Sequence, residues 1–140
     1  MALTYTTREA VLNALETALK TVSWITEVDR QQVGLPEDYS IPKGVLIHDI
    51  REVRRTVLKD CIDVRYTVMI VVYVYDEDFD SLSTDLNAAM EEVKGAIQNY
   101  FTLSGIVDKT IVETADTDAG FTAPQANGTL VLEISYLSEK

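Results

Sequence analysis

The feature that most constrains this fold is a 31-residue stretch, residues 45–75, in which two apolar, alternating runs flank a basic segment. The second run, residues 62–75, alternates over fourteen residues. A strand of that length extends about 46 Å at roughly 3.3 Å per residue, whereas a typical strand has about five or six residues. Because a small domain cannot bury so long a ribbon in its own core, we expect one end to project and meet another chain. This favours assembly over catalysis.

Charge is unevenly distributed along the chain. The 140 residues include 23 acidic and 12 basic ones, and the net charge of −11 disfavours nonspecific binding to DNA or to anionic membranes. Residues 51–65 contain five basic and three acidic residues, a local charge of +2, so the remainder carries −13. A basic projection could therefore contact the acidic surface of an identical neighbour. The alternative is a solvated hairpin tip.

The periodicity predicts one α+β domain spanning residues 1–140. A capping box is expected at Thr6 and Glu9, and Gly105 lies just beyond the second apolar helical stripe. Helices are expected over residues 7–22 and about 82–101, and strands over residues 23–28, 45–50, 62–75, 110–114 and 129–136. We expect these elements to form an antiparallel or mixed β-sheet of about four to five strands, with two helices packed on one face and a projecting β-hairpin.

Catalytic chemistry has little support in this sequence. His48 is the only histidine and Cys61 the only cysteine, and neither stands beside a nucleophile motif. One cysteine also excludes an intramolecular disulfide. The glycines are too widely spaced for a phosphate-binding loop. We therefore expect no enzyme activity, no catalytic residues and no cofactor.

Two acidic groups are weak candidates for a metal site. Asp116 and Asp118 could bind a hard cation, although Asp-x-Asp before a glycine is also common turn chemistry. The acidic residues of 76–80 precede a predicted helix, where capping accounts for them better. We expect no metal at either place. A small metal-dependent enzyme using Asp116 and Asp118 stays as an alternative, as does a generic ligand-binding α+β domain.

The sequence lacks the marks of a membrane or secreted protein. No apolar run approaches the roughly 18 residues needed to span a bilayer, and the start lacks a basic segment followed by an apolar one. Folding in the cytosol is the expectation.

The order of the predicted elements resembles the tail terminator (tail-tube capping) proteins of long-tailed bacteriophages. The similarity covers nearly the whole chain: a helix, a loop with prolines, a long ribbon, a second helix and a closing pair of strands. Its most suggestive parts are residues 66–73, the segment from Thr117 through Gly120-Phe121 to Pro124, and residues 130–136.

This resemblance implies a structural virion protein. Such proteins form a ring, expected to be hexameric, that caps the tail tube, stops its polymerisation and provides the surface that joins the head or neck. The implied partners are the tail tube protein and a head-completion or neck protein. DNA would pass through the lumen without specific binding, and no membrane is involved. The implied location is the virion tail or neck, assembled in the host cytoplasm.

The basic segment supplies the residues expected at the subunit or tube interface, namely Arg51, Arg54, Arg55 and Lys59. A projecting ribbon suits a head-to-tail interface, which forms a ring when its rotation closes. The alternative within the same class is another head-tail connector component, a head-completion or neck protein.

Overall fold

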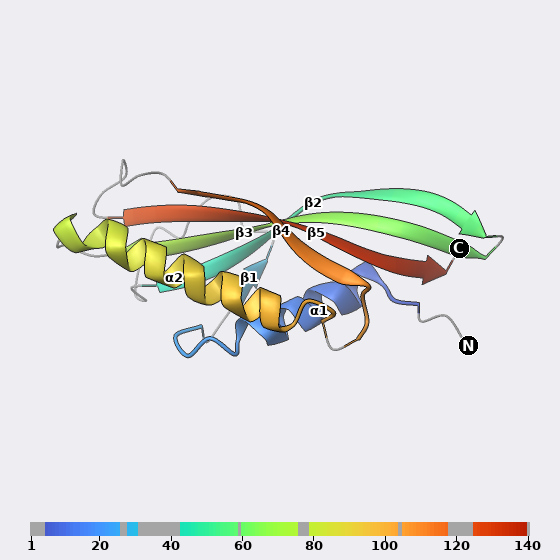
Figure 1. Ribbon diagram of the computed structural model, residues 1–140, viewed down its shortest axis with the longest axis horizontal. Helices are drawn as coiled ribbons and strands as arrows, with labels where there is room; N and C mark the ends of the chain where they lie inside the picture. Colours follow the sequence, from blue (N-terminus) through green and yellow to red (C-terminus); the bar gives the residue numbers. More distant parts are fainter. Residues whose placement is uncertain are drawn as a thin grey trace.

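The computed structural model describes residues 5–25, 28–30, 43–58, 60–75, 79–103, 105–117 and 125–139. The elements follow in the order α1 (Arg8–Leu19), β1 (Val28–Arg30), β2 (Lys43–Leu58), β3 (Cys61–Tyr75), α2 (Phe79–Asn99), β4 (Lys109–Thr117) and β5 (Gln125–Glu139). The predicted α+β class, with two helices on one face of a single sheet, is confirmed (Figure 1).

The sheet has five strands in the order β1-β2-β3-β5-β4. β1 pairs with β2 in parallel, while the other three pairings are antiparallel, so the sheet is mixed. β3 lies at the centre and is paired with β2 on one side and with β5 on the other. The register of β3 with β5 runs without a shift from Cys61 opposite Glu139 to Tyr75 opposite Gln125.

This pairing corrects the expectation that the long central strand needs another chain to complete it. β5 is longer than predicted and accompanies β3 over its entire length, so both edges of β3 are satisfied within the subunit. Figure 1 shows β2, β3 and β5 extending together beyond the helices. The extension is thus three strands wide rather than a two-stranded hairpin.

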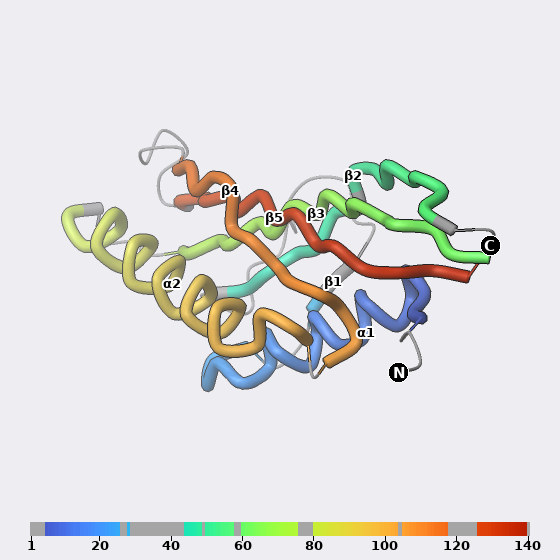
Figure 2. The backbone as a smooth tube through the Cα atoms, turned by 45° about the vertical axis from the view of Figure 1, so that its right-hand side comes forward, coloured from blue at the N-terminus to red at the C-terminus, as the bar shows by residue number. Residues whose placement is uncertain are grey.

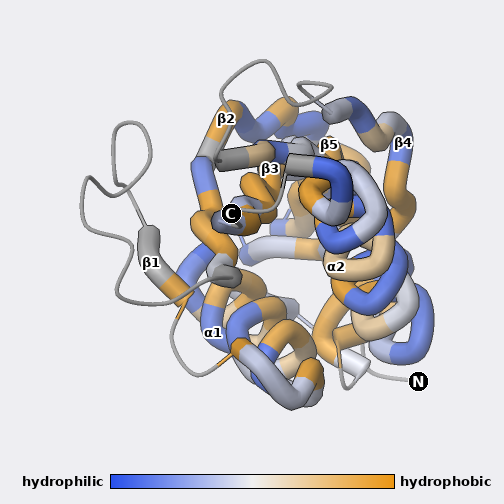
Figure 3. The backbone as a smooth tube through the Cα atoms, turned by 90° about the vertical axis from the view of Figure 1, so that its left-hand side faces the viewer, coloured by the Kyte–Doolittle hydropathy of each residue, from blue (hydrophilic) through white to orange (hydrophobic). Residues whose placement is uncertain are grey.

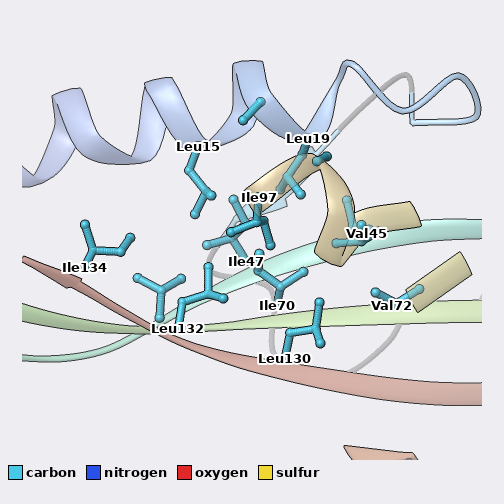
Figure 4. Close-up of a cluster of buried hydrophobic side chains, with 14 of the residues drawn as sticks. Leu15, Leu19, Val45, Ile47, Ile70, Val72, Ile97, Leu130, Leu132 and Ile134 are labelled. Atoms are coloured by element: carbon cyan, nitrogen blue, oxygen red, sulfur yellow. The ribbon is translucent and has the colours of Figure 1, made fainter. Parts of the chain in front are cut away.

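The alternation of β3 separates two faces of the sheet as predicted. Its even-numbered residues from Ile62 to Val74 belong to the main core, which also includes the inward residues of β5 and the buried sides of both helices. Figure 4 shows leucines of α1 directed toward the aliphatic side chains of the sheet, and Figure 2 shows the two helices side by side beneath it. Seen end-on in Figure 3, both helices lie on the same side. We call the other side the open face.

A small second cluster lies on the open face. Leu46, Val71 and Tyr73 are buried there, and the half-buried Met69 packs against them. The ring of Tyr73 fills the space beside Gly44, its partner on β2, so that any Cβ at position 44 would overlap that ring. Glycine at this position therefore allows an aromatic side chain to lie flat across the neighbouring strand.

Several predicted boundaries are wrong by a few residues. The N-cap of α1 is Thr7 rather than Thr6: its hydroxyl accepts a hydrogen bond of 3.2 Å from the backbone N–H of Ala10. Residues 21–25 form turns rather than the start of a strand, because their backbone N–H groups bond to the carbonyls that end α1 and to that of Val22. Gly105 follows the second helix as expected, with φ +87°, in the left-handed region that favours glycine.

Truncating a core residue of β5 should be costly. Leu132 is fully buried in the main core, so Leu132→Ala should lower the free energy of unfolding by about 2–5 kcal/mol. Its neighbour Val131 is only half-buried and points to the open face, so Val131→Ala should cost clearly less. Urea unfolding of both variants measures the difference, and equal losses would contradict the assignment of the two faces.

Candidate subunit interface

The basic residues predicted at an interface lie on the part of β2 that continues past β1. Cross-strand partners share a face, and Arg51 and Arg55 oppose Thr67 and Asp63, so both lie on the open face, where both are exposed. Arg54 opposes the buried Val64 and lies on the helical side of the sheet. The structure therefore divides the predicted group between two faces. Lys59 lies outside the described residues.

Within the described part of the chain, this part of β2 is an edge of the sheet. β1 pairs only with residues 45–47, and among the described residues no strand pairs with the outer side of residues 48–58. The register with β3 shifts between Asp49 and Arg51, which marks a bulge. Three apolar side chains along this edge are about half exposed, Ile50 at 49%, Val53 at 53% and Val57 at 56%. Open edges with apolar side chains are typical places for pairing with another chain.

Glu52 connects this edge to the body of the subunit. Its carboxylate is only 8% exposed and accepts hydrogen bonds of 2.9 Å from Arg8 Nε and 2.9 Å from the Tyr136 hydroxyl. Arg54 Nη1 lies 3.4 Å from its second oxygen. The Arg8 guanidinium also lies 5.6 Å from the centre of the Tyr66 ring, close enough for a cation–π contact. These contacts join α1, β2, β3 and β5.

Electrostatics at this cluster favour the ionised carboxylate. The hydrogen bond from Arg8 lowers the pKa of Glu52, and the bond from Tyr136 adds to it, against the opposing effect of burial. Burial raises the pKa of Tyr136, and the bond that its hydroxyl donates to Glu52 raises it further. Tyr136 therefore stays a neutral donor while Glu52 stays a charged acceptor. Such charge-assisted bonds are the stronger class of hydrogen bond in proteins.

A second ion-pair group lies on the open face of the same strands. Arg65 Nη1 lies 3.2 Å from Glu133 on β5, and Arg65 Nε lies 3.6 Å from Asp63 on its own strand. The pair with Glu133 raises the pKa of Arg65. About half of the Arg65 side chain is exposed, so solvent weakens this attraction.

The helical layer carries the opposite charge. α2 contains four acidic residues and one basic residue. Glu91 is largely exposed and lies 3.0 Å from Lys94, while Glu92 accepts a hydrogen bond of 3.2 Å from the Trp24 indole. An open groove of about 410 Å³ lies between these glutamates and the turn after α1. Its lining includes Thr21, Val22, Glu91, Glu92, Gly95 and Asn99.

The residues considered for catalysis lie apart. His48 is opposite Met69 on β3, while Cys61 begins that strand, eight residues or about 26 Å away. Cys61 is a buried free thiol. The two therefore cannot act together.

The acidic candidates for a metal site do not form a group that the structure describes. Asp116 is exposed on β4, while Asp118 and residues 76–78 lie outside the described residues. In the described part of the chain, no three His, Cys, Asp or Glu side chains come together in a way that could hold a metal ion. No helix among these residues is long and apolar enough to cross a membrane.

Comparison with known proteins shows a structural relationship. No family model matches the chain, and no curated protein matches its sequence. Among solved structures, the fold is similar to the sheath/tube terminator of PVC, an extracellular contractile injection system, determined by cryo-EM in the extended state. The TM-score is 0.55 and the identity 14%, over 99% of this chain and 60% of the terminator chain.

The comparison supports the fold expected from the sequence resemblance. At 14% identity the likeness establishes a shared fold alone, and this chain spans about 60% of the length of the PVC terminator. Even so, a fold found in a terminator extends over almost the entire chain, both helices and the long strands included.

Sequence reasoning missed the Glu52 cluster. Glu52 and Tyr136 are 84 residues apart, and Arg8 is 44 residues from Glu52, so no local spacing reveals the contacts. The one available signal was an acidic residue among the arginines of β2.

Removing the charge of Glu52 should destabilise the protein in a pH-dependent way. Glu52→Gln keeps the size of the side chain but loses charge-assisted bonds, so the free energy of unfolding at pH 7 should fall by about 1–2 kcal/mol. Because the folded pKa of Glu52 is lowered, its contribution is complete above the ordinary value of 4.5 and is lost as the pH falls through the folded value. The gap between wild type and variant should therefore narrow below pH 4.5.

Glu133→Gln is the matched control, since Glu133 pairs with the more exposed Arg65. This variant should change the free energy of unfolding by less than about 1 kcal/mol. Urea unfolding between pH 7 and pH 3 measures both. A gap for Glu52→Gln that stays constant over this range would argue against the role assigned to its carboxylate.

Proposed function

We propose that this chain is a structural, non-enzymatic tail-terminator protein that closes into a ring at the end of a tail tube and stops its growth. The observation that carries the proposal is the similarity to the PVC sheath/tube terminator over 99% of the chain. The sequence resemblance to tail-tube capping proteins of bacteriophages points the same way. We infer a hexameric ring.

The geometry of β2 supports an assembly role. Among the described residues, no strand pairs with the outer side of residues 48–58, which carry half-exposed apolar side chains. Such an edge is available for pairing with another chain. Arg51 and Arg55 lie beside this edge on the open face, while Arg54 is held by Glu52 on the other side. We therefore assign Arg51 and Arg55 to direct contact with a neighbouring subunit or with the tube. Lys59 belongs to the same proposed interface by its place in the sequence.

The partners follow from this role. A terminator contacts the tail tube protein on one side and a head-completion or neck protein on the other, and its proposed location is the tail or neck of the particle. DNA would pass through the ring without specific binding, since phosphate contacts need a basic surface and the chain carries −11.

Capping of tubes tests the proposal. Added to tail-tube protein from the same source as it polymerises, the protein should bind tube ends and stop elongation, because a closed ring offers no further site for tube subunits. Negative-stain microscopy should show shorter tubes that end in an added ring.

Heads that carry a portal serve as the control. Tubes that grow to the same length without an added ring would contradict the terminator role. Binding to such heads instead of tubes would identify a head-completion or neck protein.

A further inference from the structure

One end of the open face carries a strip suited to an acidic partner. Arg51, Val53 and Arg55 follow one another on the same side of β2, opposite Thr67, Arg65 and Asp63 on β3. The strip alternates exposed basic and apolar side chains over about 13 Å. We call these three residues of β2 the β2 strip.

The groove between α2 and the turn after α1 has complementary chemistry. Glu91 and Glu92 line it, together with the uncharged residues Thr21, Val22, Ser23, Gly95, Ala96 and Asn99. Each carboxylate can accept about four hydrogen bonds, so the bonds that Glu91 and Glu92 accept from Lys94 and Trp24 leave capacity for a guanidinium. We call this surface the α2 groove.

The two surfaces cannot meet within one chain. The β2 strip lies on the open face. The α2 groove is lined by α2 and the turn after α1, and both helices lie on the other side of the sheet (Figures 1 and 3). Contact between strip and groove therefore requires a second copy, and it joins different surfaces of the two copies. Such a head-to-tail contact can repeat around a ring.

We propose that the β2 strip of one subunit docks in the α2 groove of the next, with Arg51 and Arg55 bound to Glu91 and Glu92. Val53, which lies between the two arginines, packs against the uncharged lining of the groove. The inference rests on the proposed function and names the surface that receives the strip. Arginine suits this contact because its planar guanidinium can hold a carboxylate through two hydrogen bonds.

Charge reversal tests the docking. Arg51→Glu with Arg55→Glu places an acidic strip against an acidic groove, and Glu91→Lys with Glu92→Lys places a basic strip against a basic groove. Each double variant alone should need about tenfold or more protein to cap tubes half-maximally. An equal mixture should recover capping, because every contact in an alternating ring then joins opposite charges.

The control Lys109→Glu, at an exposed position on β4 outside both surfaces, changes the net charge in the same direction as the reversed strip and half as much. It should cap tubes as the wild type does. Native mass spectrometry of rings from the mixture should find equal numbers of the two variants. Circular dichroism confirms that each variant folds, as expected for exposed positions.

The outcomes separate the two proposals. If the wild type caps tubes and either double variant is as active as the wild type, the docking proposal is overturned and the terminator role stands. The same conclusion follows if the wild type caps tubes but the mixture of folded variants stays inactive. If the control variant also loses capping, net charge accounts for the loss of capping in the double variants, and the docking proposal is overturned. Failure of the wild type to cap tubes would overturn both.

Discussion

The pairing of β3 along both of its edges is the constraint on which the rest of this structure depends. Because β5 follows β3 residue by residue from one end to the other, the two strands act as a rigid pair without a bulge. Strict alternation along this pair places one continuous apolar face toward the helices. β2 and β4, which pair outside them, both carry register shifts, so irregularity is confined to the outer strands.

The short strand β1 determines which part of β2 is paired on its outer side. β1 pairs with residues 45–47 of β2, and residues 48–58 extend past it with no further strand on their outer side in the described part of the chain. A protruding strand edge would fray unless it were held, and Glu52 holds it by accepting bonds from Arg8 on α1 and Tyr136 on β5. The cluster thus gives a solvent-facing edge the fixed shape that a specific contact needs.

The sequence predicted those features that depend on local periodicity. Alternation over residues 62–75 predicted a strand with two separate faces, and helical spacing predicted both helices. The extension of β5 was not predictable, since Gln125 to Gly128 carry turn-forming residues and become a strand only through pairing with β3. The sequence grouped Arg51, Arg54 and Arg55 together. Strand alternation alone places Arg54 on the face opposite Arg51 and Arg55, and the bulge after Asp49 decides which face each takes: Val45 and Ile47 before it face the core, whereas Arg51 and Arg55 after it face away.

The distribution of charge disfavours one kind of contact between identical subunits and favours another. A two-fold contact through the open edge would place Arg51 and Arg55 against the same residues of the other copy, and like charges at close range oppose it. The proposed head-to-tail contact would avoid this repulsion, because it would pair the strip with a surface of opposite sign. Two subunits of −11 still repel one another at long range, but at physiological salt that repulsion is screened beyond about 8 Å. Pairs in direct contact are screened less, so local complementarity decides which surfaces meet.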